Sequence, residues 1–208
     1  MDKTYTTEAK IEAYLGGILI TTGQAANFIL AAQAFIEKFT GRSFKADSVA
    51  SARLYSGNDR QDLRIDDCVE VTKVEVGNNQ WGDSFTEVTN AVGQTPEYYL
   101  MPINYLSEYA PEQEPIDKIG LRSRAWIFGH ANHRITAKWG YAVTPPDDIS
   151  FAATVIAAGM YYQNRGENTG AIKSERIGEY QVSYSEQKGF NDFEQAMAIL
   201  RSYKKYEI

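Results

Sequence analysis

Residues 134–165, RITAKWGYAVTPPDDISFAATVIAAGMYYQNR, decide the fold of this chain. Residues 134–141 alternate between apolar and polar side chains, which predicts a half-buried strand. Thr144 offers an N-cap oxygen, and Pro145 and Pro146 suit a first helical turn, where a missing N–H costs nothing. The apolar residues that follow repeat at steps of three and four, as in a long helix with one apolar stripe. We therefore expect a strand that leads directly into a core helix.

Three further stretches, residues 7–15, 21–39 and 191–203, also repeat apolar residues at helical spacing. Together with the long helix they predict a frame of about four helices. Between these stretches the apolar period changes to two, and turn residues recur at short intervals, which is typical of an antiparallel sandwich or barrel. The expected strands are residues 51–55, 63–65, 69–76 with a break near Thr72-Lys73, 85–88, 98–101, 116–121, 125–128 and 134–141.

The fold class that follows is α+β, a helical frame with an inserted antiparallel β-sandwich or β-barrel domain. We place the helical domain at residues 1–49 and 144–208 and the inserted β domain at residues 50–143. Residues 178–185 alternate once more and predict a late strand or hairpin. A lone strand is not stable in water. This strand therefore pairs either within its own subunit or with a neighbouring subunit, through Ile177, Tyr180, Val182 and Tyr184.

The composition bounds the partners of the chain. It has 208 residues, of which 43% are hydrophobic, so it can bury a core. Its net charge of −6, with no basic run longer than Lys204-Lys205, argues against tight, sequence-specific DNA binding. The single Cys68 excludes an intrachain disulfide. Residues 1–10 show no signal pattern and no apolar run reaches the ~20 residues of a membrane span, so we expect a soluble, cytosolic chain.

Several motifs and their order resemble the head-tail connector (adaptor) proteins of tailed bacteriophages. The strand ends in Trp-Gly-Tyr at residues 139–141, and the helix starts with Pro-Asp-Asp-Ile at 146–149 and runs into Tyr161-Tyr162. The segment IKSERIGEYQVSYS at 172–185 is similar to a run that follows the long helix in that family. AFIEKFTGRSF at 34–44 is similar to the end of the family's early helix. The large β insertion is absent from many members.

The resemblance implies a structural virion protein, assembled in the host cytoplasm, that forms a ring of twelve subunits under the portal. Such a ring joins the capsid vertex to the neck and tail and extends the channel through which DNA passes without sequence-specific binding. It also implies that the C-terminus meets the portal protein, through Leu200, Tyr203, Lys204, Lys205, Tyr206 and Ile208. Another neck component, such as a stopper or tail terminator, is the nearest alternative.

Residue types that support catalysis or metal binding are sparse, so we expect no enzyme activity, no metal and no cofactor. His130 and His133 are three residues apart without a third ligand nearby, which favours two exposed loop histidines over a metal site or a hydrolase. Cys68 has no adjacent base and reads as a small core residue. A different class of function remains open, a glycan- or receptor-binding virion module that stacks sugars on Trp81, Tyr98, Tyr99 and Trp126.

Overall fold

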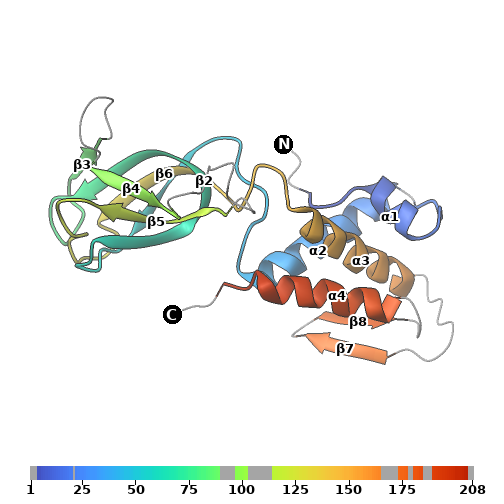
Figure 1. Cartoon of the computed structure of the whole chain (residues 1–208). Coiled ribbons are helices and arrows are strands. Elements are labelled where there is room, and N and C mark those ends of the chain that lie inside the picture. The colour runs from blue at the N-terminus through green and yellow to red at the C-terminus, as the bar shows by residue number, and fades with distance from the viewer. Residues whose placement is uncertain are drawn as a thin grey trace. The chain divides into compact units, whose positions relative to one another are not determined.

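The computed structural model describes residues 4–20, 22–89, 97–102, 114–164, 173–177, 180–184 and 189–205. The chain divides into two compact units, a helical unit of Met1–Phe44 with Pro145–Ile208 and a β unit of Lys45–Thr144 (Figure 1). The expected α+β fold class is confirmed, with four helices and a six-stranded antiparallel sheet in the described residues. In that part of the chain, no helix combines the length and hydropathy that a membrane span requires.

The helical unit is built around α3 (Asp147–Asn164), which contacts all three other helices, α1 (Glu8–Tyr14), α2 (Thr22–Thr40) and α4 (Gly189–Ser202) (Figure 1). Alanines along α3 let the neighbouring helices approach closely. The fully buried residues of the unit include Ile11, Ala25, Ala32, Ile36, Phe44, Ile149, Ala152, Ile156, Ala157, Ala158, Ala196 and Leu200. The long apolar stripe predicted for residues 149–161 is therefore the core of this unit.

The start of α3 differs from the prediction. Its first helical hydrogen bond runs from the Ser150 N–H to the Pro146 carbonyl, so the helix begins at Asp147. Thr144, the expected N-cap, is exposed and lies two residues too early. The Asp148 carboxylate accepts the Ile149 N–H at 2.8 Å instead. Negative charge at this end also suits the helix dipole.

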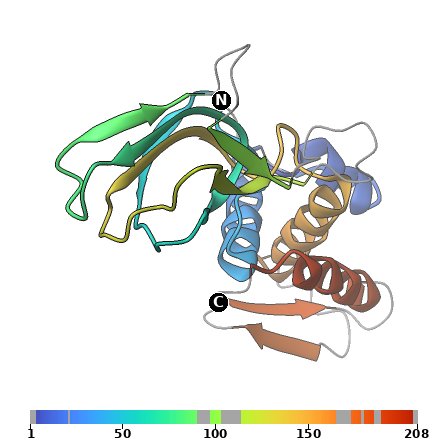
Figure 2. The ribbon, with the colours of Figure 1, turned by 60° about the vertical axis from the view of Figure 1, so that its left-hand side comes forward.

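The β unit is one strongly bent sheet that curls around its own core (Figure 2). Its strands are β1 (Ser51–Tyr55), β2 (Asp62–Gly77), β3 (Phe85–Val88), β4 (Tyr98–Met101), β5 (Ile116–Leu121) and β6 (His133–Trp139). The order across the sheet is β1-β6-β2-β5-β4, and β3 pairs with β2 beside this path. Alternate side chains of β2, β5 and β6 point inward and form most of the core of this unit. They are Leu63, Ile65, Cys68, Val74, Val76, Ile116, Ile119, Leu121, Ile135, Ala137 and Trp139.

Strand β2 corrects two predictions. Residues 63–65 and 69–76 belong to one 16-residue strand, not to two. Asp66-Asp67, between the two predicted strands, and Thr72-Lys73, at the predicted break, lie where the pairing register shifts, between Arg64 and Cys68 and between Val71 and Lys73. A bulge admits an extra residue and bends the strand without ending it. These bulges are what let β2 curve around the core.

The predicted strand at residues 125–128 is wrong. This segment has no strand pairing and is held by separate hydrogen bonds, from the Trp126 N–H to the Arg60 carbonyl and from the Asp59 N–H to the Trp126 carbonyl. Trp126 is fully buried and its indole N–H donates to the Ile119 carbonyl at 3.1 Å. The apolar run therefore closes one end of the core as a loop.

A clamp of residues 45–47 with residues 139–142 joins the entry and the exit of the β unit. Lys45 and Ala142 form an isolated parallel bridge, and the Ala46 N–H donates to the Ala142 carbonyl at 2.8 Å. The Asp47 N–H donates to the Trp139 carbonyl. Gly140 has φ 135°, and a Cβ there would stand 2.5 Å from the Ala46 Cα, so the close approach requires glycine.

Candidate interaction surfaces

The late strand pairs within its own chain. β7 (Lys173–Ile177) and β8 (Tyr180–Tyr184) form an antiparallel hairpin in which Ile177 stands opposite Tyr180 and Glu175 opposite Val182. In the described residues this sheet has two strands, and β8 also contacts α3, which supports the hairpin within its own chain. The hairpin accounts for one edge of β8, and its second edge has no strand partner in the part of the chain that the structure describes.

The residues predicted to contact the portal fall into three groups. Leu200 is fully buried in the helical core and offers no surface. Tyr203 is half-buried, donates its hydroxyl to the Asp148 carboxylate at 3.0 Å and packs edge-on against Phe44. Lys204 is exposed, with its ammonium 5.6 Å from the centre of the Phe39 ring. The backbone of this segment is therefore folded onto its own helices.

The remaining portal candidates lie at the very end of the chain. The Lys205 N–H donates to the Thr40 carbonyl at 2.8 Å, so the main chain is anchored up to this residue. Arg42 supports the same segment by donating from Nε to the Tyr203 carbonyl at 2.7 Å. Tyr206 and Ile208 lie outside the described residues. The part left for a partner is thus Lys204 and whatever follows Lys205.

The outward face of α2 is almost free of charge. Its exposed residues before Lys38 are Gly23, Gln24, Ala26, Asn27, Leu30 and Ala34, and Leu30 is 59% exposed. A helix that faces only water normally carries charged residues on its outer side. Uncharged small and apolar residues instead suit contact with another protein.

The edge strand β1 is unusually open. It pairs with β6 over five residues without a register shift, and all its residues except Tyr55 are exposed. The single charge of β1 is occupied, since the Arg53 guanidinium binds the Asp66 carboxylate at 2.7 Å and lies 4.5 Å from the centre of the Trp139 ring. Its other edge has no partner strand among the described residues.

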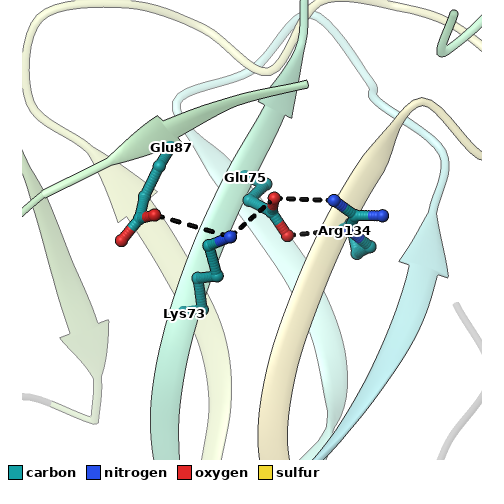
Figure 3. A network of polar contacts seen from close by, with 4 residues as sticks. All are labelled: Lys73, Glu75, Glu87 and Arg134. Atoms are coloured by element: carbon teal, nitrogen blue, oxygen red, sulfur yellow. Dashed lines mark hydrogen bonds and ion pairs between the residues drawn. The ribbon is translucent and has the colours of Figure 1, made fainter. Parts of the chain in front are cut away.

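Four charged residues form an ion-pair network on the outer face of the β unit (Figure 3). Glu75 accepts two hydrogen bonds of 2.7 Å from Arg134 and one of 3.0 Å from Lys73, which also reaches Glu87 at 3.5 Å. The Glu75 side chain is 8% exposed, whereas Arg134 and Lys73 are about 40% exposed. The hydrogen bonds from Arg134 lower the pKa of Glu75 to about 2 against the opposing effect of burial.

The two histidines do not lie in the same environment. His130 is exposed, as expected, but His133 is fully buried, which corrects the prediction of two exposed loop histidines. The Nδ1 of His133 accepts the Gly77 N–H at 3.3 Å, so Nε2–H donates to the Ile127 carbonyl at 3.0 Å. Burial lowers its pKa. Both nitrogens are engaged, which leaves none for a metal or a substrate.

The other candidate chemical residues are also placed by the fold. Cys68 is fully buried, and burial raises the pKa of its thiol to about 12, which suits a core residue and not a nucleophile. No cluster of three or more metal-ligating side chains occurs in the residues that the structure describes. Trp81 is 72% exposed on a loop, but Trp126 is buried and cannot stack on a sugar. Tyr98 and Tyr99 are adjacent in β4 and so face opposite sides.

Asn132, which the sequence analysis did not single out, organises the loops at one end of the β unit. It is fully buried, accepts the Gly57 N–H at 3.0 Å and donates to the carbonyls of Ile127 and Asn79. Gly57 has no room for a side chain, since a Cβ would stand 1.8 Å from the Ile127 carbonyl oxygen. An isolated asparagine before a strand carries no sequence signal for this role, because two of its partners, Gly57 and Asn79, lie 75 and 53 residues away in sequence.

Comparisons with known proteins point to the fold of particle necks. No protein-family model and no curated protein matches the chain. A chain from the neck of an empty gene transfer agent (GTA) particle, computed with C6 symmetry, matches with a TM-score of 0.58 and 14% identity, over 100% of this chain and 93% of that one. A chain from the virion of a native GTA particle matches with a TM-score of 0.54 and 15% identity, over 96% and 89%. At this identity the likeness shows a shared fold.

Proposed function

We propose that this chain is a structural neck protein of a tailed-phage-like particle, and more narrowly a head-tail adaptor. In this role copies of the chain form a ring, of twelve subunits by the family resemblance, that binds the portal protein and extends the DNA channel toward the neck and tail. The proposal places the chain in the virion and gives it a mechanical task. In this role the ring contacts DNA only while DNA passes through the channel, without recognising its sequence.

The observation that carries the proposal is the extent of the fold likeness. A neck chain is matched over the whole of this chain and 93% of its own length, so the match includes both the helices and the β unit. That neck was computed with C6 symmetry, and cyclic symmetry repeats a chain around an axis. The order of the helical motifs in the sequence supports the same class independently.

The surfaces of the molecule suit such a ring. The uncharged outer face of α2, with exposed Leu30, supports contact between neighbouring subunits. The portal contact in this proposal is made by Lys204 and the residues after Lys205, since the main chain is anchored up to Lys205. The net charge of −6 disfavours tight binding of DNA phosphates, which suits a channel wall.

We propose a non-enzymatic role. His133 has both nitrogens hydrogen-bonded, and the thiol of Cys68 is buried with its pKa raised to about 12. Of the two histidines considered for a hydrolase from the sequence, His133 thus has no free nitrogen, whereas His130 is exposed. Replacing both histidines by alanine would change the stability of the β unit as well as any activity, because His133 is buried. His130→Ala alone changes an exposed side chain and is therefore the cleaner test of hydrolase activity.

The experiment is electron microscopy and mass photometry of the purified chain, alone and mixed with the portal of its particle. We expect closed rings, either free or stacked on the portal. A deletion after Lys205 should weaken portal binding and leave free rings intact. Rings that bind a tail tube or a second neck ring but never the portal would instead indicate a stopper or tail terminator. A chain that stays monomeric in every mixture would overturn the ring.

A further inference from the structure

We infer that the exposed edge of β1 (Ser51–Tyr55) receives strand β8 (Tyr180–Tyr184) of a second copy of this chain. The β7–β8 hairpin of one subunit would thereby extend the six-stranded sheet of its neighbour. This inference rests on the proposed ring and names the contact that holds adjacent subunits together. Pairing of main-chain N–H and C=O groups along an open sheet edge is a recognised way to bind an extended segment.

The receiving edge lacks the features that normally protect a sheet edge. Folded proteins block such edges with proline, lysine, bulges or a covering element. The strand β1, SARLY, contains no proline or lysine, and its pairing with β6 has no bulge. Arg53 is drawn onto Asp66 and Trp139, so its charge does not guard the edge. Ala52 and Leu54 point to the other face, where Leu54 is 55% exposed.

The donated strand matches this edge in charge and length. The strand β8, YQVSY, is uncharged, so it meets an edge whose only charge is already neutralised. Both strands have five residues. In an antiparallel pairing centred on Arg53 and Val182, Tyr180 of the donor stands at the position opposite Tyr55 of β1, an aromatic cross-strand pair. The strand β7, KSERI, carries three charges and is the less suitable donor.

The hairpin also gains from the contact. A two-stranded hairpin needs support from a helix or from further strands to be stable in water, and in this chain β8 contacts α3. In the part of the chain that the structure describes, β7 and β8 have no third strand. Pairing β8 with β1 of the next copy would supply it. Because the donor and the acceptor are different surfaces, the contact is heterologous, which is the type of interface that forms a ring when its rotation closes.

Disulfide trapping between two different variants, each with one introduced cysteine, tests the contact. A tagged A52C protein is mixed with an untagged S183C protein or with an untagged Q181C protein. If β1 and β8 pair antiparallel with Arg53 opposite Val182, position 52 lies opposite position 183. If they pair parallel with the same centre, position 52 lies opposite position 181. Native Cys68 is buried and stays in place. We expect one of the two mixtures to give a tagged–untagged covalent dimer under mild oxidation. Only contact between copies can produce that species.

A substitution of the edge provides the second arm. Ala52→Lys adds a protective charge to β1 and should lower the fraction of rings at least ten-fold at equal concentration. Ser48→Lys adds the same charge at an exposed position before the strand and should leave assembly unchanged. Tryptophan fluorescence confirms that both variants keep a folded β unit, since Trp81, Trp126 and Trp139 all lie there.

The outcomes separate this contact from the ring itself. Rings that form normally with Ala52→Lys and give no mixed disulfide would overturn the strand exchange and leave the neck function standing. A chain that never associates, with or without the portal, would overturn both, because β8 would have no second copy to enter. Mixed dimers together with loss of rings in Ala52→Lys would support the contact as the one that holds the ring.

Discussion

Replacing Glu75 by glutamine should destabilise the β unit at neutral pH and remove part of its sensitivity to acid. The carboxylate accepts bonds from Arg134 and Lys73 and is 8% exposed. A pKa held at about 2, against an ordinary value of 4.5, corresponds to about 3.4 kcal/mol of preference for the charged form. Because both cations are about 40% exposed, water screens them, and we expect about 1–2 kcal/mol of lost stability.

The sign of the pH effect follows from the lowered pKa. The charged Glu75 stabilises the fold fully above about pH 4.5, and this contribution disappears as the pH falls from there toward 2. Glu75→Gln has no such carboxylate. The difference in unfolding free energy between the wild-type chain and the variant should therefore be largest at pH 7 and shrink toward pH 2.

Urea unfolding followed by tryptophan fluorescence is the assay, because all three tryptophans lie in the β unit. Glu87→Gln is the matched control. Glu87 is 52% exposed and 3.5 Å from Lys73, so its loss should cost less than about 0.5 kcal/mol. A Glu75→Gln protein as stable as wild type at pH 7, or one with an unchanged difference at pH 3, would refute the assignment of Glu75 as a charged, stabilising centre.

Three other substitutions test separate parts of the fold. Gly57→Ala should cost more than about 2 kcal/mol in the fluorescence assay, because the new Cβ would overlap the Ile127 carbonyl; a neutral effect would contradict the loop arrangement. Burial lowers the pKa of His133, so its neutral form stabilises the β unit above about pH 6.5 and this contribution falls as the pH drops; His133→Gln should flatten that dependence and His130→Gln should not. Tyr203→Phe keeps the ring contact but loses the hydrogen bond from the hydroxyl to Asp148. The free energy of unfolding, followed by the helical signal in circular dichroism, should fall by about 1 kcal/mol, and an unchanged unfolding midpoint would exclude the bond.

Local patterns were sufficient for most of the elements. The strands at residues 51–55, 85–88, 98–101 and 116–121 coincide with β1, β3, β4 and β5, because each is a short alternating run bounded by turn residues. The core stripe of α3 also follows directly from spacing. These features depend on neighbours in sequence, and a single sequence contains that information.

Features set by distant contacts were not predictable in the same way. A polar pair such as Asp66-Asp67 looks the same at a strand end and at a bulge, and only the partners β5 and β6 distinguish the two. The apolar run around Trp126 resembles a strand, but its hydrogen bonds go to Arg60 and Asp59, far away in sequence. The buried state of His133 likewise depends on Gly77 and Ile127.

The clamp of residues 45–47 with residues 139–142 affects how the rest of the chain folds. The segment between α2 and α3 is the entire β unit, about 100 residues. If that unit folds first, its clamped ends behave like a loop of a few residues. The entropic cost of closing a loop grows with the logarithm of its length. Bringing α2 and α3 together therefore costs about 3 kcal/mol less than across an unfolded segment of the same length. Folding of the inserted sheet would thus lower the entropic cost of packing α2 against α3 in the helical unit.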